Sequence, residues 1–358
     1  MKIALLSYST KPRGGVVHTL ALAEALAALG EDVTVWTLGR GGDQGFFRPV
    51  HPAVRVRIVP FADGPEGETP GERILRSIAR LRDAFDPAPY DIVHAQDCIS
   101  ANAVGRCIRT VHHIDHFTTP ELAACHERAI VEPYAHVCVS SAVADELHDG
   151  WGLTATVIPN GVAYKRFATT DPAARARWRS RLGRYVLTVG GIEPRKGSLD
   201  LLEAYGLLRT DHSDVRLVIA GGETLFDYRG YRRRWEERAA ELDVEPVVLG
   251  PVPDDELPSL VAAADAFAFP SRKEGFGLAA MEALAAGVPL VVRDLPVLRE
   301  VFGRAACFAD TPEELATGLG RALTIDAPTR QTAGRELAAR HTWAQAADRH
   351  VALYRFLS

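Results

Sequence analysis

Short apolar runs alternate with longer amphipathic segments along most of this chain. The run KIALLSY (2–8) precedes the amphipathic segment VVHTLALAEALAALG (16–30), and the alternation returns in the second half from YVLTVGG (185–191) onward. Runs that are apolar throughout fit strands buried on both faces, and helices that follow them connect parallel strands. The pattern therefore predicts an α/β fold with two doubly wound parallel sheets.

The length of 358 residues also favours two domains, because it exceeds what one hydrophobic core usually supports. The segment between the two halves, 158–178, is rich in turn residues and is the expected linker region. We expect an N-terminal Rossmann-like domain at 1–165 and a second one at 166–340. Ligands of such sheets bind beyond the carboxyl ends of the strands, so the expected site is an interdomain cleft.

Charge and cysteine content exclude several classes of protein. The formal net charge of -5 argues against nucleic-acid binding as the main role, because phosphate neutralisation needs a basic face. The 5 cysteines are odd in number and never spaced C-x-x-C, which suggests neither a disulfide framework nor a zinc site. The first residues resemble a strand rather than a signal peptide, and no apolar run approaches a membrane span. A cytoplasmic protein is expected.

Two loops are candidates for phosphate binding. Gly14 and Gly15 follow the first strand and directly precede a helix, where free backbone N–H groups can receive a phosphate, although a purely structural turn explains them equally well. The loop GGIEPRKGS (190–198) places Arg195 and Lys196 after a strand of the second half. Paired cations of this kind suit a diphosphate, and a solvated basic loop is the alternative.

A third candidate is the stretch PSRKEGFGLAAMEALAAGVPLVV (270–292), which carries Glu274 before a helix and Glu282 inside it. The start of that helix attracts anions, whereas a carboxylate there would repel a phosphate. The glutamates are better placed to accept hydrogen bonds from hydroxyls, one set on a sugar and the other on a ribose. This is the layout of a nucleotide-sugar site, although helix-stabilising or solvated glutamates give the same pattern.

The segment EGFGLAAMEALAAGVP (274–289) resembles the E-x7-E signature of retaining nucleotide-sugar glycosyltransferases of family 4, which have the GT-B fold. The resemblance runs along nearly the whole chain and includes GG (14–15), YDIVHAQD (90–97), TVHH (110–113), VIPNGV (157–162), EPRKG (193–197), ADAFAFPS (264–271) and HTWAQAADRHVALYRFL (341–357). It departs from the family pattern at Gly191, where many members carry an arginine, and at Gln96, often a histidine. Arg195 is the expected replacement for the missing charge.

The resemblance implies a role for each candidate. Arg195 and Lys196 would neutralise the diphosphate, Glu274 would hold a sugar hydroxyl, Glu282 would accept from the ribose, and His112 would lie on the acceptor side. The remaining donor contacts implied by the resemblance are the loop at Gly14 and Gly15, the backbone of Gly275, Phe276 and Gly277, and the backbone near Val252. The last helix, 341–358, would pack back onto the first domain.

For the reaction, the resemblance implies transfer with retention at the anomeric carbon. Negative charge builds on the leaving diphosphate, and preorganised cations that face it are usually the largest catalytic contribution. His112, His113, Asp115 and His116 could suggest a metal site. However, the chain has no D-x-D motif, and the resemblance implies catalysis with no cofactor and no metal. The donor is a UDP-, GDP- or ADP-sugar.

The acceptor stays open between a sugar, a lipid and a small molecule. The segment ERILRSIARLRDAF (72–85) would place Ile74, Leu75, Ile78, Leu81 and Phe85 near one face of a helix. Packing on the first sheet explains this face, and peripheral contact with the inner face of a membrane is the alternative. Two other functions stay open, a glycoside hydrolase and a non-catalytic sugar-nucleotide-binding protein on the same fold.

Overall fold

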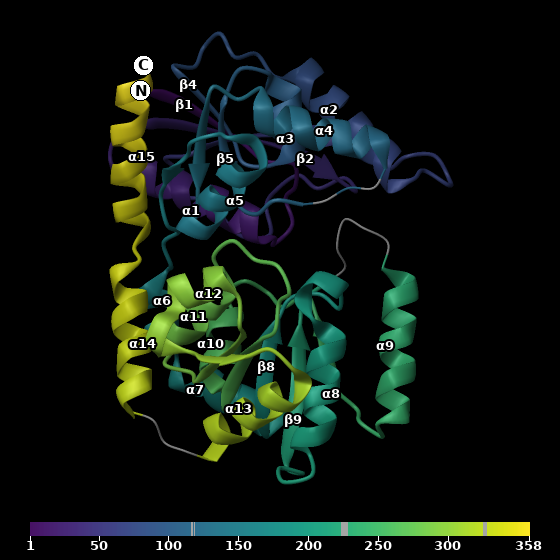
Figure 1. The fold of residues 1–358 in the computed structure, drawn as a ribbon. Helices are drawn as coiled ribbons and strands as arrows, with labels where there is room; N and C mark the ends of the chain where they lie inside the picture. The colour runs from purple at the N-terminus through teal and green to yellow at the C-terminus, as the bar shows by residue number, and fades with distance from the viewer. Residues whose placement is uncertain (116, 118, 223–227, 325–327) are drawn as a thin grey trace. The chain divides into compact units, whose positions relative to one another are not determined.

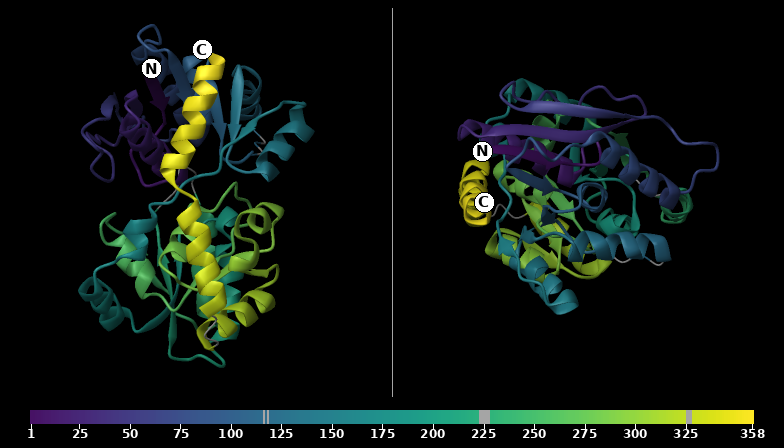
Figure 2. Two further views of the ribbon diagram at one scale, coloured as in Figure 1. Left: turned by 90° about the vertical axis from the view of Figure 1, so that its left-hand side faces the viewer. Right: turned by 90° about the horizontal axis from the view of Figure 1, so that it is seen from above.

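The computed structural model describes residues 1–115, 117, 119–222, 228–324 and 328–358 (Figure 1). The chain forms two compact units. Unit 1 comprises Met1–Gly161 and Trp343–Ser358, and unit 2 comprises Val162–Thr342. The C-terminal residues therefore belong to the same unit as the N-terminus, and both ends of the chain lie close together in that unit (Figure 2).

Unit 1 is built on a parallel sheet in the order β3-β2-β1-β4-β5-β6-β7 within the described residues. The strands are β1 (Lys2–Leu6), β2 (Asp32–Arg40), β3 (Arg55–Phe61), β4 (Ile92–Ala95), β5 (Ile108–Val111), β6 (Ala135–Cys138) and β7 (Thr156–Val157). Ile3 of the central strand pairs with Val33 on one side and Ile92 on the other, and all three are buried. The apolar run at 2–8 is thus a strand buried on both faces, as predicted.

Helices cover both faces of this sheet (Figure 1). They are α1 (Gly14–Ala28), α2 (Pro70–Ala84), α3 (Cys98–Val104), α4 (Pro120–Val131), α5 (Ser141–Trp151) and α15 (Trp343–Leu357). The first and last of these, α1 and α15, contact each other and share one hydrophobic core with the sheet. The C-terminal helix is therefore an integral part of unit 1.

Helix α2 packs on unit 1 through the apolar face that the sequence predicts. Thr69 and Glu72 form a capping box at its N-terminus, and Ile74, Ile78 and Leu81 are buried. Leu75 is the exception, because it is 41% exposed. Packing thus accounts for most of the apolar face, and peripheral membrane contact stays a prediction.

Unit 2 repeats the architecture with the strand order β10-β9-β8-β11-β12-β13, again parallel in the described part of the chain. Its strands are β8 (Arg184–Val189), β9 (Val215–Ala220), β10 (Val247–Gly250), β11 (Ala266–Phe269), β12 (Leu290–Arg293) and β13 (Cys307–Ala309). Its α-helices are α6 (Tyr164–Ala168), α7 (Pro172–Leu182), α8 (Ser198–Leu208), α9 (Arg229–Glu241), α10 (Leu257–Ala263), α11 (Leu278–Ala285), α12 (Pro296–Phe302), α13 (Pro312–Thr324) and α14 (Pro328–Arg340). Short 3₁₀ turns lie at Pro194–Lys196 and Gly303–Ala305. The two parallel sheets confirm the predicted α/β fold.

The unit boundaries differ by a few residues from the expected 165/166 and 340/341. Helix α6 packs against α10, α11 and α14, so the chain enters unit 2 before this helix begins. The Val162 N–H donates to the His341 carbonyl oxygen at 2.8 Å, which joins the two ends of unit 2. The helix expected at 341–358 begins only at Trp343.

Several strands give no clear signal in the sequence analysis. β3 alternates arginine with valine at its start, which is the pattern of a strand with one exposed face rather than of a buried run. β5, β12 and β13 are short. Neighbouring strands define them, because a run of three or four residues has no periodicity of its own.

No helix within the described residues combines the length and the apolar character that crossing a bilayer requires.

Buried histidines attach α15 to the sheet of unit 1. The Tyr354 hydroxyl hydrogen-bonds His94 Nδ1 at 2.7 Å, and Thr110 Oγ1 hydrogen-bonds the other ring nitrogen at 2.7 Å. The ring of His350 lies 5.7 Å from that of His94. Burial lowers the pKa of His350 to about 4 and holds the pKa of His94 well below its usual value. Both rings are therefore neutral near pH 7.

These histidines make the stability of unit 1 dependent on pH. Below pH 6.5 the unfolded chain takes up protons that the folded ring of His350 rejects until about pH 4, so stability is lost as the pH falls through this window. His350→Gln should reduce this loss by about 1.4 kcal/mol per pH unit. Urea unfolding at several values between pH 7 and pH 4 measures the slope. His51→Gln, at an exposed histidine, is the control and should leave the slope unchanged.

Candidate functional site

In unit 2, two predicted site loops follow adjacent strands at the point where the strand order reverses. β8 and β11 are neighbours at the centre of the sheet, whereas β9 lies on the far side of β8. The loop after β8 carries Arg195 and Lys196, and the loop after β11 carries Glu274. Such a switch point is the usual ligand position in an open parallel sheet, because the connections diverge there.

The structure brings Arg195, Lys196 and Glu274 into one ion cluster. Lys196 Nζ donates to Glu274 Oε1 at 2.6 Å, and Arg195 Nη1 donates to the same oxygen at 3.2 Å. Arg195 Nη2 also donates to Glu193 Oε1 at 3.1 Å. The side chains of Lys196 and Glu274 are only 21% and 12% exposed. The two cations are therefore held in place by carboxylates in the ligand-free molecule.

A close backbone contact between the two loops fixes this cluster. The Arg272 N–H donates to the Arg195 carbonyl oxygen at 2.8 Å. Gly197 has a φ of +64°, and a Cβ at this position would stand 2.2 Å from the Pro270 carbonyl oxygen. Only glycine fits there, because any side chain would push the loops apart and is strained at this φ.

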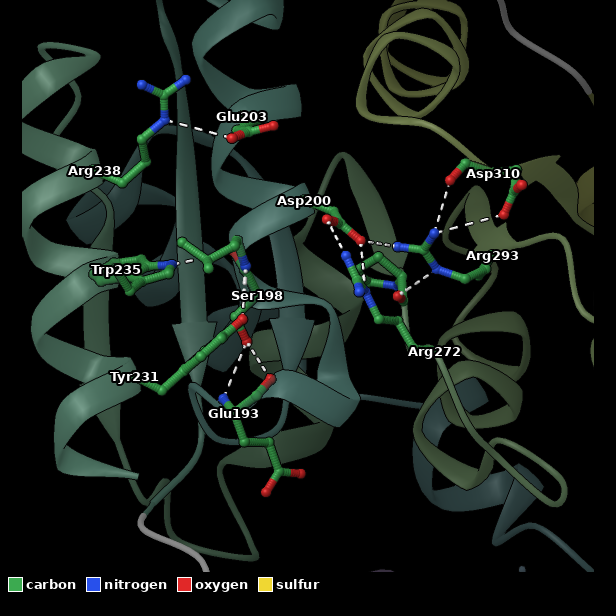
Figure 3. Close-up of polar contacts among 12 residues, drawn as sticks. Glu193, Ser198, Asp200, Glu203, Tyr231, Trp235, Arg238, Arg272, Arg293 and Asp310 are labelled. Carbon is green, nitrogen blue, oxygen red and sulfur yellow. Dashed lines mark hydrogen bonds and ion pairs between the residues drawn. The ribbon is translucent and has the colours of Figure 1, made fainter. Parts of the chain in front are cut away.

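Side chains of α9 and α8 hold the backbone on either side of the Arg195–Lys196 turn. Figure 3 shows the contacts of Trp235, Tyr231, Ser198 and Glu193. Trp235 Nε1 donates to the Ser198 carbonyl oxygen at 3.1 Å, and the Leu199 N–H donates to the Tyr231 hydroxyl at 3.1 Å. The Ser198 hydroxyl in turn accepts a 3.3 Å hydrogen bond from the Glu193 N–H. The first turn of α8 is thus tied to α9.

The Glu274 loop has its own support, centred on Asp200 of α8 (Figure 3). Arg272 donates to Asp200 at 2.8 Å, and Arg293 of β12 also pairs with Asp200. Arg293 Nε donates to the Pro270 carbonyl oxygen at 2.9 Å. Burial would raise the pKa of Asp200, but the two guanidinium groups bring it below its usual value. The carboxylate therefore stays ionised and holds both arginines.

The Gly275–Gly277 segment forms a buried turn into α11. Gly277 has a φ of +93°, and a Cβ there would meet the rings of Phe302 and Phe269 at 3.1 and 3.2 Å. The ring of Phe276 is buried and lies 5.7 Å from that of His341. Helix α11 begins with neither a side-chain cap nor an acidic residue in its first turn. This end of the helix suits an anion.

Glu282 lies on α11 near the loop that follows β10. Burial raises the pKa of its carboxyl to about 7, the charge of Arg166 opposes the shift, and that of Asp254 adds to it. Arg166 and Asp254 form an ion pair at 2.8 Å. Val252 lies two residues before Asp254, so the predicted base-binding segment and the predicted ribose ligand are brought into one region. No hydrogen bond to the Glu282 carboxyl is formed by the residues that the structure describes.

In unit 1, Gly14 and Gly15 open α1 and His112 follows β5. His112 packs directly on the first turn of α1, because a Cβ at Gly15 would stand 3.5 Å from its ring. Burial lowers the pKa of His112 to about 3, and the nearby His113 and Arg109 add to this shift. The imidazole is therefore neutral at physiological pH, and it can exchange hydrogen bonds but carries no charge.

His18 supports His112, and the sequence analysis missed this contact. The two rings meet edge to face with their centres 4.7 Å apart. His18 Nδ1 donates to Asn160 Oδ1 at 2.8 Å, and the ring of Trp343 lies 5.3 Å away on another side. Asn160 and Trp343 lie next to the two points in the sequence where the chain passes from one unit to the other. The signal in the sequence was a histidine in the first turns of the helix that follows Gly14-Gly15.

Among the residues considered as a possible metal site, His113 Nε2 approaches Asp115 Oδ2 at 3.3 Å. His116 lies outside the described residues. Across the described ranges, no group of three or more histidine, cysteine, aspartate or glutamate side chains could hold a metal ion.

Two family models match the chain, one in each half. Glycosyltransferase Family 4 matches residues 12–166, and Glycosyl transferases group 1 matches residues 174–339. The D-inositol 3-phosphate glycosyltransferase of Mycolicibacterium gilvum is 30% identical over 97% of this chain and 87% of its own length. The phosphatidyl-myo-inositol mannosyltransferase of Mycolicibacterium smegmatis is 29% identical over 90% of this chain and 84% of its own.

Solved structures show the same fold at low sequence identity. Sucrose-phosphate synthase from Thermosynechococcus elongatus superimposes with a TM-score of 0.81 at 21% identity and covers 100% of this chain and 99% of its own. HepE of Anabaena, in complex with UDP and glucose, gives a TM-score of 0.74 at 19% identity, with 99% of each chain covered. The chain therefore has the GT-B fold.

Gly197→Ala tests the contact between the two loops of unit 2. The left-handed backbone costs an alanine roughly 1–2 kcal/mol, and the clash with Pro270 adds to it. We expect a loss of more than about 2 kcal/mol in the free energy of unfolding of unit 2, measured in urea. Gly250→Ala is the matched control within unit 2, because Gly250 has a φ of +70° and open space around it. Equal losses in both variants would show that the loops do not press on each other.

Proposed function

Because the chain belongs to the glycosyltransferases of family 4, we propose that it transfers a sugar from a nucleoside diphosphate sugar to an acceptor hydroxyl, with retention and without a metal ion. The observation that carries this proposal is the pair of cations, Arg195 and Lys196, held on Glu274 at the switch point of unit 2. A leaving diphosphate is the ligand that such a pair would stabilise.

The proposed chemistry of unit 2 follows from charge. Cleavage of the bond between sugar and phosphate leaves negative charge on the diphosphate and positive character on the anomeric carbon. Arg195 and Lys196, together with the N-terminal end of α11, would stabilise the negative charge on the diphosphate. Glu274 lies beside both cations and would also accept a hydrogen bond from a hydroxyl of the sugar. The cations need little reorganisation, because carboxylates already hold them in the ligand-free molecule.

Glu282 is the proposed ribose ligand. Its carboxyl has no hydrogen bond from the described residues, and two ribose hydroxyls would supply donors to it. The segment at Val252 is the proposed base contact, next to the ion pair of Arg166 and Asp254. The nucleoside would thus lie at one end of α11 and the diphosphate at the other.

Unit 1 is the proposed acceptor unit. His112 is a neutral imidazole placed against the Gly14-Gly15 turn, and we assign it to the acceptor side near the reacting carbon. The acceptor is a hydroxyl of a sugar, a lipid or a small molecule. Two relatives are named for D-inositol 3-phosphate and phosphatidyl-myo-inositol, so phosphorylated polyols are the first acceptors to test.

A binding and transfer assay tests the function. Thermal shifts with UDP-, GDP- and ADP-sugars identify the donor, beginning with UDP-sugars, because the structure of HepE contains UDP. The product is then followed by NMR, which reports the anomeric configuration. We expect retention and full activity in excess chelator. Donor binding without turnover would favour a sugar-nucleotide-binding protein, and hydrolysis of a glycoside without a nucleotide would favour a glycosidase.

Substitution of the two cations tests their proposed role. Lys196→Ala and Arg195→Ala should each lower kcat on the order of 10²-fold, as removal of one preorganised donor does. The double variant should lose less than the product of the two effects, because both side chains act on one anion. Lys165→Ala, at an exposed lysine of α6, is the control. Full activity of Arg195→Ala would leave Arg13 as the next candidate for the charge missing at Gly191.

Glu282 makes donor binding depend on pH. Ribose hydroxyls donate to the ionised carboxylate, so binding should weaken as the pH falls below about 7, where the carboxyl takes up a proton. A nucleotide sugar is the probe, because its diphosphate diester does not titrate near neutral pH. Calorimetry between pH 6 and pH 8 should show the dependence in the wild type and its loss in Glu282→Gln. An identical pH dependence in both proteins would contradict the assignment.

A further inference from the structure

Unit 1 contains a cavity that the proposed function has not used. It lies where β2 and β3 end and α2 begins, and Arg40, Phe61, Asp63, Glu68, Arg73 and Arg76 line it, together with glycines and a proline of the 61–68 loop. The carboxyl ends of β2 and β3 form the edge of the sheet at which ligands bind in parallel folds. The cavity therefore lies at the carboxyl-terminal edge of the sheet, beside β2 and β3.

Arg40 is the central cation of this cavity, and its partners are neutral. Arg40 Nε donates to the Tyr8 carbonyl oxygen at 3.3 Å, and Nη2 donates to Ser77 Oγ at 2.7 Å. The guanidinium lies over the rings of Tyr8 and Phe61 at 5.4 and 5.1 Å. Within the described residues Arg40 forms no ion pair. A guanidinium in this position is fixed in orientation but keeps its charge uncompensated by a direct carboxylate contact.

Like charges surround Arg40. Burial lowers its pKa, and the charges of Arg13 and Arg73 add to this shift, whereas those of Tyr8 and Asp97 oppose it. Arg13 belongs to the N-terminal end of α1, and its Nε is buried without a hydrogen-bond partner. Burial raises the pKa of Asp97, whose charge opposes the shift of Arg40. An anion bound beside Arg40 would relieve this repulsion.

The other two arginines of the cavity share one carboxylate. Arg73 Nε donates to Glu68 at 3.2 Å, and Arg76 donates to both oxygens of Glu68 at 2.7 and 3.1 Å. Glu68 is held against Gly64, where a Cβ would stand only 2.2 Å from its carboxyl. Arg76 is fixed further by the Phe61 ring, 4.1 Å away. Arg73 makes the weaker contact with Glu68 and is 39% exposed, so it is free to turn toward a ligand.

We propose that this cavity binds a phosphate ester through Arg40 and Arg73, and that the phosphate belongs to the acceptor. The first part rests on the cavity alone, and the second rests on the proposed function. Guanidinium groups from two elements, Arg40 of β2 and Arg73 of α2, line the cavity, and guanidinium groups suit the oxygens of a phosphate. Arg76, Glu68 and Phe61 form the fixed wall of the site.

Direct binding tests the site without any transfer reaction. Soluble inositol phosphate and neutral inositol are titrated by calorimetry into the full chain. Arg73→Gln should weaken inositol phosphate binding on the order of 10-fold, as loss of one charge-assisted contact does, and Arg40→Gln should weaken it at least as much. Neutral inositol should bind more weakly than inositol phosphate in the wild type. Arg80→Gln, on the same helix, is the control, because Arg80 hydrogen-bonds the Pro60 carbonyl oxygen.

Two further arms make the result decisive. Lys196→Ala separates this site from the proposed donor site. If inositol phosphate binding is lost in Lys196→Ala and is unchanged in Arg73→Gln, the proposal is wrong. Arg73 lies at the surface, so its variant remains informative where Arg40→Gln fails to fold. Vesicles with and without phosphatidylinositol identify the source, since flotation that is lost in Arg73→Gln assigns the site to a lipid headgroup.

The transfer assay then links the site to the acceptor. Arg73→Gln should raise KM for a phosphorylated acceptor on the order of 10-fold and leave KM for the donor unchanged. If inositol phosphate binding depends on Arg73 but the wild type transfers no sugar, the proposed function is wrong and the phosphate site stands. Transfer with unchanged acceptor KM and phosphate affinity in Arg73→Gln would keep the function and remove this inference.

Discussion

One carboxylate, that of Glu274, organises the candidate site of unit 2. It receives hydrogen bonds from Lys196 at 2.6 Å and from Arg195 at 3.2 Å, and it joins loops that lie far apart in the sequence. Two cations that approach each other without an anion would repel, so the carboxylate is what lets both stand at the switch point before a ligand arrives. A diphosphate that binds there has to share these cations with Glu274.

The rest of unit 2 keeps this arrangement in register. Gly197 permits the close approach to Pro270, Asp200 fixes the arginines of the facing loop, and α9 anchors the first turn of α8. Unit 1 uses a different device, a group of buried neutral histidines around His112 that also attaches the C-terminal helix. Charge thus prevails at the candidate site of unit 2, whereas burial keeps the histidines of unit 1 uncharged.

The sequence predicted the fold class and the loops of the site, because each loop has a local signature: glycines before a helix, adjacent cations after a strand, and two glutamates around a helix start. It could not predict the pairing of Lys196 with Glu274, since strand order, not spacing, decides which loops meet. For the same reason Gly197, His18 and Arg40 were overlooked: Gly197 meets Pro270, His18 meets His112, and Arg40 contacts Tyr8, Phe61 and Ser77. The edge strand β3 alternates arginine with valine at its start, and β13 has only 3 residues, so neither has the apolar run of β1.

The central claim is that Glu274 restrains two cations that the diphosphate needs, and Glu274→Gln tests it most directly. The substitution keeps the shape of the side chain and removes its charge, so the carboxylate that Arg195 and Lys196 share no longer competes with the diphosphate for them. Calorimetry with free nucleoside diphosphate should show binding on the order of 10-fold tighter than in the wild type. Single-turnover transfer should slow on the order of 10²-fold. Weaker diphosphate binding, or transfer at the wild-type rate, would contradict the account.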